Sequence, residues 1–374
     1  MPAFPEIGPI LRAIALLAAL CLAPTAATMA DPASPLFPIV DNGKWGFIDT
    51  AGTVVIAPRL PDYTSFHDGL ARSQEDGKPV FVDRSGKTAL RPPFEIARDF
   101  SEGLAAVNIG ERRIPTIGMI QETGRWGYID RNGKLVLPMT FTQADSFSEG
   151  LAAVHDGKQG GFIDHGGKMV FKAEFDVSWG FHEGLALVKS HLKMAYLDRA
   201  GRRLPTPPLD DNSSGASFSE GLAAVEIGGL WGYVDKSGKL VIPATFRQAA
   251  SFHEGLAAVE PAEDGPRQSC PRQADGSSYS FVQSYGYIDR SGRMVIPATH
   301  ERASDFSEGL ALVSTCRRSR FIDHAGKTII AIPYDDADLL PFSNGLAAIS
   351  VLDGTGLRRG YIDKQGKLVR PLSN

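Results

Sequence analysis

Short runs of apolar residues alternate with glycine-rich, charged turns along the chain from about residue 45 onward. One run reads Trp-Gly-Tyr-Val-Asp at residues 231–235, and a Lys-Ser-Gly-Lys turn separates it from a second apolar run at residues 240–243. Aromatic and β-branched runs bounded by turn residues are typical of short strands. The pattern therefore predicts an all-β protein.

The same pattern recurs in about nine copies, each with an aspartate followed three residues later by a glycine. These pairs are Asp49 and Gly52, Asp83 and Gly86, Asp130 and Gly133, Asp164 and Gly167, Asp198 and Gly201, Asp235 and Gly238, Asp289 and Gly292, Asp323 and Gly326, and Asp363 and Gly366. The shortest interval between successive aspartates is 34 residues, so longer intervals contain insertions, the two largest at about residues 108–124 and 260–284. A fixed period of this length indicates a repeat architecture.

The Asp-x-x-Gly segment predicts a tight turn between two antiparallel strands. Aspartate favours the first position of a type I turn, and glycine tolerates the positive φ of the bulge that often follows. The proline near the end of the second strand, as at Pro243, marks a sheet edge or a strand end because it lacks an N–H. The aspartates are thus interpreted as structural turn residues.

A second block, Phe-x-Glu-Gly-Leu-Ala, alternates with the first and predicts a third, alanine-rich strand. Its acidic position is Asp68, Glu102, Glu149, Glu183, Glu220, Glu254 and Glu308, and then Asn344. We interpret this position as serving turn geometry or a helix-end contact. Each unit is then a three-stranded antiparallel meander, and the spacing of Phe246, Ala249 and Phe252 predicts one helical turn in the connection to the next unit.

Nine complete units with no unit split between the chain ends favour an open, curved stack, in which each unit covers its neighbour's apolar face. A closed, propeller-like ring is the alternative, although propellers usually have four to eight blades. The small alanine-rich strand would suit the crowded inner edge of such a ring.

The first 30 residues resemble a targeting segment, which leaves residues 31–374 for the repeat domain. Arg12 precedes an apolar stretch at residues 13–22, and small residues follow with candidate cleavage after Ala27 or Ala30. This layout is typical of a secretory signal peptide. We therefore expect a periplasmic or secreted protein with no transmembrane segment in the mature chain.

Composition argues against nucleic-acid binding. The formal net charge is −4, and no long run of Lys or Arg is present to neutralise phosphates. The mature chain would keep two cysteines, Cys270 and Cys316, in equivalent turns of consecutive units. Disulfides persist in oxidising compartments, so these two cysteines are expected to form one.

No catalytic or cofactor-binding motif stands out. The chain has no Gly-x-Ser-x-Gly, phosphate-binding or dinucleotide motif, and no closely spaced histidine or cysteine pair for zinc. A calcium site would need several converging carboxylates, whereas each turn offers one aspartate, usually beside a Lys or Arg. We expect no cofactor, no metal and no enzymatic activity, with a hydrolase as the least favoured alternative.

The recurring Trp-Gly-Tyr-Ile-Asp-x-x-Gly-Lys-x-Val-Ile-Pro and Phe-Ser-Glu-Gly-Leu-Ala segments resemble the bacterial WG-repeat (KWG-repeat) family over nearly all of the chain from Trp45. The resemblance implies repeated β units and binding roles at the cell envelope, with no reaction. We therefore expect a non-catalytic scaffold for an unknown protein partner. The alternative is a module for glycan or peptidoglycan, which would need solvent-facing rings at Trp45, Trp126 and Trp231.

Overall fold

The computed structural model describes residues 34–373 apart from 111, 114–119, 122–123, 192, 210–214, 264–267, 271–279, 282–283 and 355. The expected signal peptide at residues 1–30 lies outside this range. All regular elements of the described residues are strands. None of these residues belongs to a helix with the length and apolarity needed to cross a membrane.

The strands fall into four classes by their position in the repeat, with four further strands in the insertions. The alanine-rich strands are β1 (Phe37–Asp41), β5 (Leu70–Glu75), β9 (Leu104–Ile109), β15 (Ala152–His155), β19 (Leu185–Ser190), β21 (Leu222–Ile227), β24 (Leu256–Pro261), β30 (Ala311–Thr315) and β34 (Leu346–Asp353). The aromatic strands are β2 (Lys44–Ile48), β6 (Lys78–Asp83), β12 (Arg125–Asp130), β16 (Gly160–Ile163), β20 (Lys193–Asp198), β22 (Leu230–Asp235), β27 (Tyr285–Asp289), β31 (Arg318–Ile322) and β35 (Gly356–Asp363).

The outer strands are β3 (Val54–Leu60), β7 (Thr88–Leu90), β13 (Leu135–Phe141), β17 (Met169–Lys172), β23 (Leu240–Ala249), β28 (Met294–His300), β32 (Thr328–Asp335) and β36 (Leu368–Ser373). The inner strands are β4 (Phe66–His67), β8 (Ile96–Ala97), β14 (Gln143–Ala144), β18 (Val177–His182), β29 (Arg302–Ala303) and β33 (Asp338–Leu339). The insertions contain β10 (Arg112–Arg113), β11 (Ile120–Gln121), β25 (Gln268–Ser269) and β26 (Ser280–Phe281).

Most units have four strands instead of the three predicted. The order is inner, alanine-rich, aromatic and outer, as in the sheet β14-β15-β16-β17, and all pairs are antiparallel. The described residues form eight principal sheets for nine repeat units, because one six-stranded sheet joins two units through β23 and β24. The repeat thus contains a short extra strand that the three-strand prediction lacked.

The predicted helical turn between units is wrong. Phe246 and Ala249 lie in β23, which continues the outer strand of one unit into the inner position of the next. Phe246 and Ala249 are three residues apart because of strand alternation and a bulge between Phe246 and Gln248, and not because of a helix. A single spacing match over seven residues cannot distinguish the two structures.

The core lies between neighbouring units. Ala106 and Tyr128 of one unit pack with Ala152 and Ile163 of the next in a single buried cluster. The Tyr128 hydroxyl donates a 2.7 Å hydrogen bond to the carbonyl of Asp145 in the following unit, and Tyr233 and Tyr287 make the equivalent bond. Each unit therefore completes its core only with its neighbour, as expected for a repeat protein.

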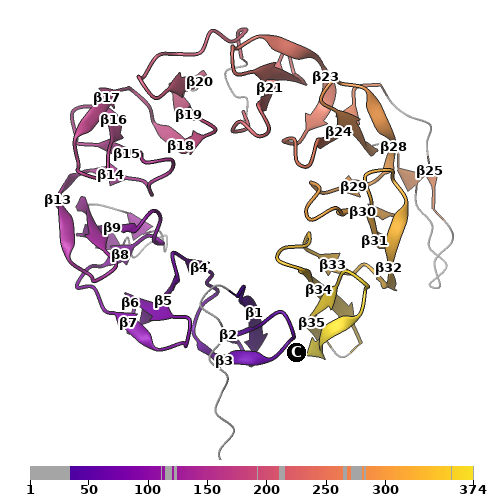
Figure 1. The fold of residues 1–374 in the computed structure, drawn as a ribbon, viewed down its shortest axis with the longest axis horizontal. Coiled ribbons are helices and arrows are strands. Elements are labelled where there is room, and N and C mark those ends of the chain that lie inside the picture. The colour runs from indigo at the N-terminus through magenta and orange to yellow at the C-terminus, as the bar shows by residue number, and fades with distance from the viewer. Residues whose placement is uncertain are drawn as a thin grey trace, which may run out of the picture.

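The units close into a ring (Figure 1), so the prediction of an open stack is wrong and the alternative holds. The first and last units share a cluster of Phe37, Ile39, Ile48, Leu346 and Tyr361. The Tyr361 hydroxyl donates to the carbonyl of Pro38. The ring thus closes through apolar packing and one hydrogen bond, without a unit divided between the chain ends. Closure is favourable because an open stack would leave both terminal apolar faces in water.

All nine Asp-x-x-Gly segments form the same turn. In each, the glycine N–H donates to the aspartate carbonyl, and the aspartate Oδ1 accepts N–H groups from two and four residues ahead, as Asp235 does from Ser237 and Lys239. The turn also packs on the outer strand of the preceding unit. A Cβ on Gly52 would lie 2.6 Å from the carbonyl oxygen of Val369, across the ring closure.

The other repeated glycine, in the Trp-Gly pair, permits a close backbone approach. A Cβ on Gly232 would lie 2.6 Å from the carbonyl oxygen of Ile242, where the outer strand carries a register shift. An outer strand that bulges toward its partner leaves no room for a side chain.

Strand alternation gives the ring two distinct faces. The turn between inner and alanine-rich strands and the Asp-x-x-Gly turn lie on one face, which we call the motif face. The turns between alanine-rich and aromatic strands lie on the opposite face, and both long insertions occur there, between β9 and β12 and between β24 and β27. We call this the insertion face.

We expect Gly238→Val to lower the free energy of unfolding by about 1–3 kcal/mol. Gly238 has a φ of +86°, and a Cβ there would lie 2.6 Å from the carbonyl oxygen of Pro205. Asp235→Asn should cost less, because asparagine keeps an Oδ1 acceptor and tolerates turns. Denaturant unfolding of both variants measures the difference, and an equal or larger loss for Asp235→Asn would contradict the turn assignment.

Candidate functional site

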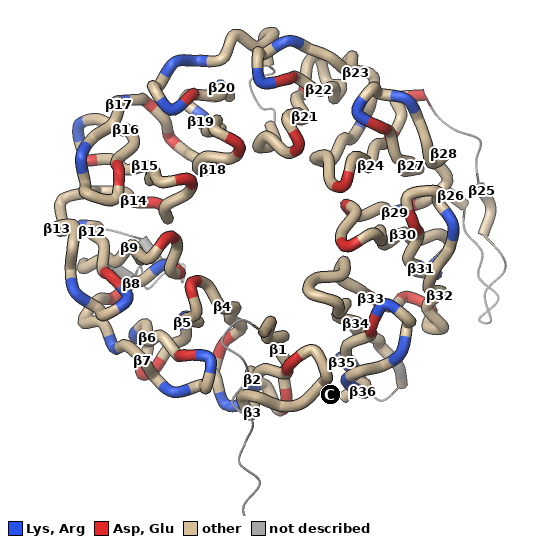
Figure 2. Tube along the Cα trace, viewed as in Figure 1, with Lys and Arg blue, Asp and Glu red and all other residues tan. Residues whose placement is uncertain are grey.

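The acidic residue of the Phe-x-Glu-Gly block occupies a tight hairpin turn at the inner end of most sheets (Figure 2). At Ser101 and Leu104 the N–H and carbonyl groups bond reciprocally, and Glu102 and Gly103 between them have φ values of +53° and +83°. A two-residue turn with two positive φ values is a type I′ hairpin, which prefers asparagine or aspartate before glycine. Glutamate is unusual there, so the side chain must serve another purpose.

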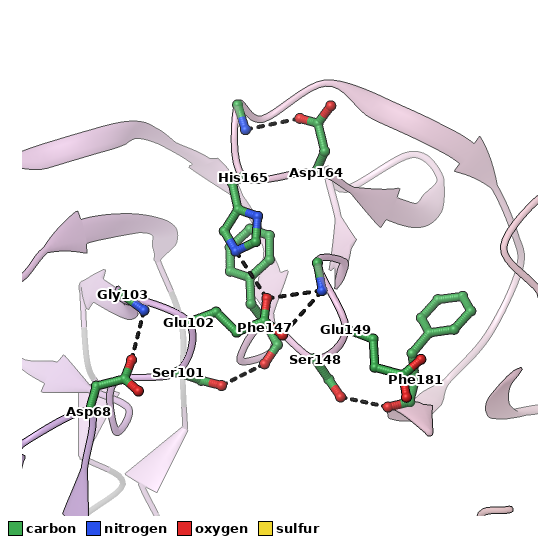
Figure 3. A network of polar contacts seen from close by, with 12 residues as sticks. Asp68, Ser101, Glu102, Gly103, Phe147, Ser148, Glu149, Asp164, His165 and Phe181 are labelled. Carbon is green, nitrogen blue, oxygen red and sulfur yellow. Dashed lines mark hydrogen bonds and ion pairs between the residues drawn. The ribbon is translucent and has the colours of Figure 1, made fainter. Parts of the chain in front are cut away.

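The purpose is a bridge to the next unit (Figure 3). The Glu102 carboxylate accepts the Gly150 N–H at 2.9 Å. The Glu149 carboxylate accepts the N–H groups of Glu183 and Gly184 at 2.6 and 2.8 Å. The same bond joins Asp68 to Gly103, Glu183 to Gly221, Glu220 to Gly255, Glu254 to Gly309, and Glu308 to Gly345. The serine of the block adds a second bridge, as Ser148 Oγ does to the Phe181 carbonyl at 2.6 Å.

A basic side chain from the following unit, Lys, Arg or His, contacts the carboxylate at most of these joints. The residue after the motif aspartate pairs with the preceding unit's acid in Glu102–His165 at 3.0 Å, Glu149–Arg199 at 3.9 Å, Glu183–Lys236 at 3.0 Å, Glu254–His324 at 3.1 Å and Glu308–Lys364 at 3.0 Å. His165 and His324 also stack on Phe147 and Phe306, with ring centroids 4.4 Å apart in both pairs. The motif face therefore uses its carboxylates to hold the ring together.

The titration of these acids agrees with their role. Burial alone would raise the pKa of Glu183, but the Lys236 ammonium and the N–H groups of Gly221 and Glu220 hold that pKa below its ordinary value. Burial would also raise the pKa of Glu308, but the Lys364 ammonium and the Gly345 N–H outweigh this effect and lower that pKa. Hydrogen bonds that favour the charged carboxylate stabilise the fold at pH values at which the carboxylate is ionised.

The acidic joint is absent from the ring closure. Asn344 replaces the glutamate, and the turn that it would reach is formed by Ser34 and Pro35, of which the proline has no N–H to donate. Thr50 stands after the first motif aspartate, where most other units have a cation. The first and last units are thus held by apolar contacts and the Tyr361 hydrogen bond instead.

The structure joins Cys270 and Cys316 by a disulfide with a Cα–Cα distance of 5.3 Å. Cys270 is buried and follows β25 in the longer insertion, whereas Cys316 lies in the turn between β30 and β31. The bridge ties this insertion to the next unit on the insertion face.

The repeated tryptophans are core residues to different degrees. Trp126 is 1% exposed, with the Arg98 guanidinium 4.9 Å from its ring, whereas Trp45 and Trp231 are half-buried. The buried Trp126 ring therefore cannot form part of a glycan-binding surface. Within the described part of the chain, no three His, Cys, Asp or Glu side chains gather as a metal site would require.

Sequence reasoning placed the motif aspartates and glycines in turns but did not identify the bridge formed by the second acidic series. A signal was present in the sequence, because the acid is replaced by Asn344 at the joint whose partner turn contains Pro35. The prediction of turn geometry described where the acidic residue lies but not its hydrogen bond to the next unit.

We expect Glu183→Gln to lower the free energy of unfolding by about 1–3 kcal/mol at pH 7, because the hydrogen bonds to the charged carboxylate are weakened. Since the folded pKa of Glu183 lies below its ordinary value of 4.5, this stability is present above pH 4.5 and is lost as the pH falls through the folded pKa. The difference between wild type and variant should therefore shrink below pH 4.5.

Thermal melts between pH 7 and pH 3 measure this dependence, with Glu174→Gln, a change at an exposed carboxylate, as the matched control. A constant difference across the range, or an equal effect of the control, would contradict the role of the bridge.

Among solved structures, the chain is similar to AztD from Citrobacter koseri, at 13% identity over 89% of this chain and 92% of that chain, with a TM-score of 0.38. It is also similar to Hsv2p from Kluyveromyces lactis, at 10% identity over 59% and 74% of the two chains with a TM-score of 0.37, and to the tricorn protease, at 12% identity with a TM-score of 0.25. The chain spans 39% of the length of the tricorn protease. These similarities are too distant to bear on function. No curated protein matches.

The repeat itself has a known counterpart. The family described as "WG containing repeat" matches residues 45–78, 81–112, 126–157, 161–190, 215–231, 231–260, 285–315 and 320–354, which together are more than half of the chain. The chain belongs to the family of WG-containing repeat proteins.

Proposed function

We propose that this protein is a non-catalytic binding scaffold that holds a protein partner on its insertion face, in the periplasm or outside the cell. The proposal rests chiefly on the contrast between the two faces. On the motif face the acidic side chains form hydrogen bonds between units. The insertion face carries exposed apolar side chains and the two long insertions.

The exposed apolar side chains support a protein partner. Leu352 and Leu357 pair across the hairpin between β34 and β35, and Leu352 is 73% exposed. Ile109 is the last residue of β9, where the first insertion begins, and is also exposed. Exposed apolar side chains that lie side by side, as Leu352 and Leu357 do, are a feature of interaction sites in soluble proteins.

The insertions support the same face. Long loops on a rigid scaffold carry binding residues more often than the scaffold does. The disulfide between Cys270 and Cys316 fixes one point of the longer insertion against the neighbouring unit. A loop held in this way loses less conformational freedom on binding, which favours affinity.

The experiment is capture of partners by the immobilised mature chain from the periplasmic fraction and the culture medium of the source organism, with quantitative mass spectrometry. The doubly substituted variant Leu352→Glu with Leu357→Glu tests the insertion face. Val241→Glu, at an exposed apolar position on the outer strand β23, is the matched control.

We expect at least one protein to be enriched by wild type and by Val241→Glu, and its enrichment to fall about tenfold in the double variant. Capture that is unchanged in the double variant, or equally lost in the control, would overturn the assignment of the face. Enrichment of no protein in either fraction would overturn the proposed function.

A further inference from the structure

A cavity of about 220 Å³ lies at the ring closure, between the first and last units. Its walls include Ile39 and Trp45 from the first unit, Leu339 from β33 with the adjacent Leu340, and Tyr63 from the segment after β3. The acidic bridge is missing at this joint, as it also is between the first and second units, where Ser34 replaces the acid. The first and last units therefore meet without the contact that closes most other joints.

Two arginines in the cavity wall depart from the repeat. Arg359 occupies the place of the tryptophan in the Trp-Gly pair, where the first unit has Trp45. Arg370 stands seven residues after the motif aspartate, where other units have apolar residues such as Ile242 and Ile296. In the last unit, therefore, guanidinium groups stand at two positions that carry uncharged residues in the other units.

These guanidinium groups lack counterions. Among the residues that the structure describes, the side chains of Arg359 and Arg370 have no hydrogen bond or ion pair; Arg359 is exposed and Arg370 is half-buried. The one acidic residue of the wall, Asp338, is exposed and lies beside the apolar Leu339. Cations at the wall of an apolar cavity are favourable sites for an anion, because the low local dielectric strengthens their attraction.

The opposite wall is apolar and aromatic. Trp45 and Tyr63 pack edge to face with ring centroids 5.0 Å apart. Tyr63 is 61% exposed and Leu340 is 62% exposed, so both keep apolar surface open to a ligand at the cavity. A small number of polar groups among apolar walls is the usual composition of a small-molecule site.

A peptide strand is a poorer fit than a small molecule. The first unit has no inner strand among the described residues, so β1 presents a sheet edge at the cavity. However, Pro38 has no N–H to donate, and its carbonyl already accepts the Tyr361 hydroxyl. An added strand would therefore lose both hydrogen bonds at that residue.

From this arrangement we infer that the cavity at the ring closure binds a small amphipathic organic anion, with its carboxylate at Arg359 and Arg370 and its apolar body against Trp45, Tyr63 and Leu339. Arginine binds carboxylates with two parallel hydrogen bonds, which favours a carboxylate over a neutral group. The cavity is smaller than the roughly 300–1,000 Å³ of drug-sized sites, which indicates a small ligand. The inference is independent of the protein partner proposed above.

The test is titration calorimetry of the mature chain with octanoate and, as its uncharged counterpart, 1-octanol. Octanoate should bind at one site per chain, and octanol at least about tenfold more weakly. The variant with Arg359→Trp and Arg370→Ile restores the residues of other units and should abolish octanoate binding. Arg359→Gln with Arg370→Gln removes the charges without filling the cavity and should weaken octanoate at least about tenfold.

Lys367→Gln, at an exposed cation of the same unit, is the matched control and should bind octanoate as wild type does. Melting temperatures of all variants establish that they are folded. Equal affinity for octanoate and octanol, octanoate binding that survives in both double variants, or no octanoate binding to wild type would each overturn the inference.

Discussion

The ring depends on one interaction that recurs at seven joints between units, the hydrogen bond from the turn N–H groups of one unit to the carboxylate of the unit before it. The glutamate that provides this carboxylate adopts a left-handed backbone conformation, as at Glu149 with a φ of +51°, which disfavours a long side chain. The strain is offset because the side chain then reaches the next turn, where Glu149 receives two backbone N–H groups and lies 3.9 Å from the Arg199 guanidinium. Because this contact and the packing of the Asp-x-x-Gly turn both lie on the motif face, insertions on the opposite face leave the ring undisturbed.

The ring closure shows what happens where this interaction is missing. Asn344, Pro35 and Thr50 replace the three groups that form the joint elsewhere, and the apolar cluster around Phe37 and Tyr361 takes over. Because this joint does not form the acidic bridge, its residues need not follow the repeat pattern. The arginines at positions 359 and 370 and the cavity beside them occur at this joint.

Much of the unit could be predicted from the sequence, because its signals are local. The Asp-x-x-Gly turn, the aromatic strand and the outer strand ending at proline follow from residue preferences over a few positions. The inner strand was missed because it spans two residues in units such as the one with β8, and because glutamate before glycine is not the usual type I′ signal. Closure remained only the alternative in the sequence analysis, because it depends on contacts between Phe37 and Tyr361, more than 300 residues apart, which no periodic pattern reports.

Amide hydrogen exchange at the inner turns tests the central claim most directly. The Gly221 N–H is bonded to Glu183 at 2.8 Å, whereas the turn of Gly69 follows a unit with Ser34 in place of the acid. The account predicts slower exchange at Gly221 than at Gly69, and a selective loss of protection at Glu220 and Gly221 in Glu183→Gln. Equal exchange at the two glycines in wild type, together with unchanged protection in the variant, would contradict it.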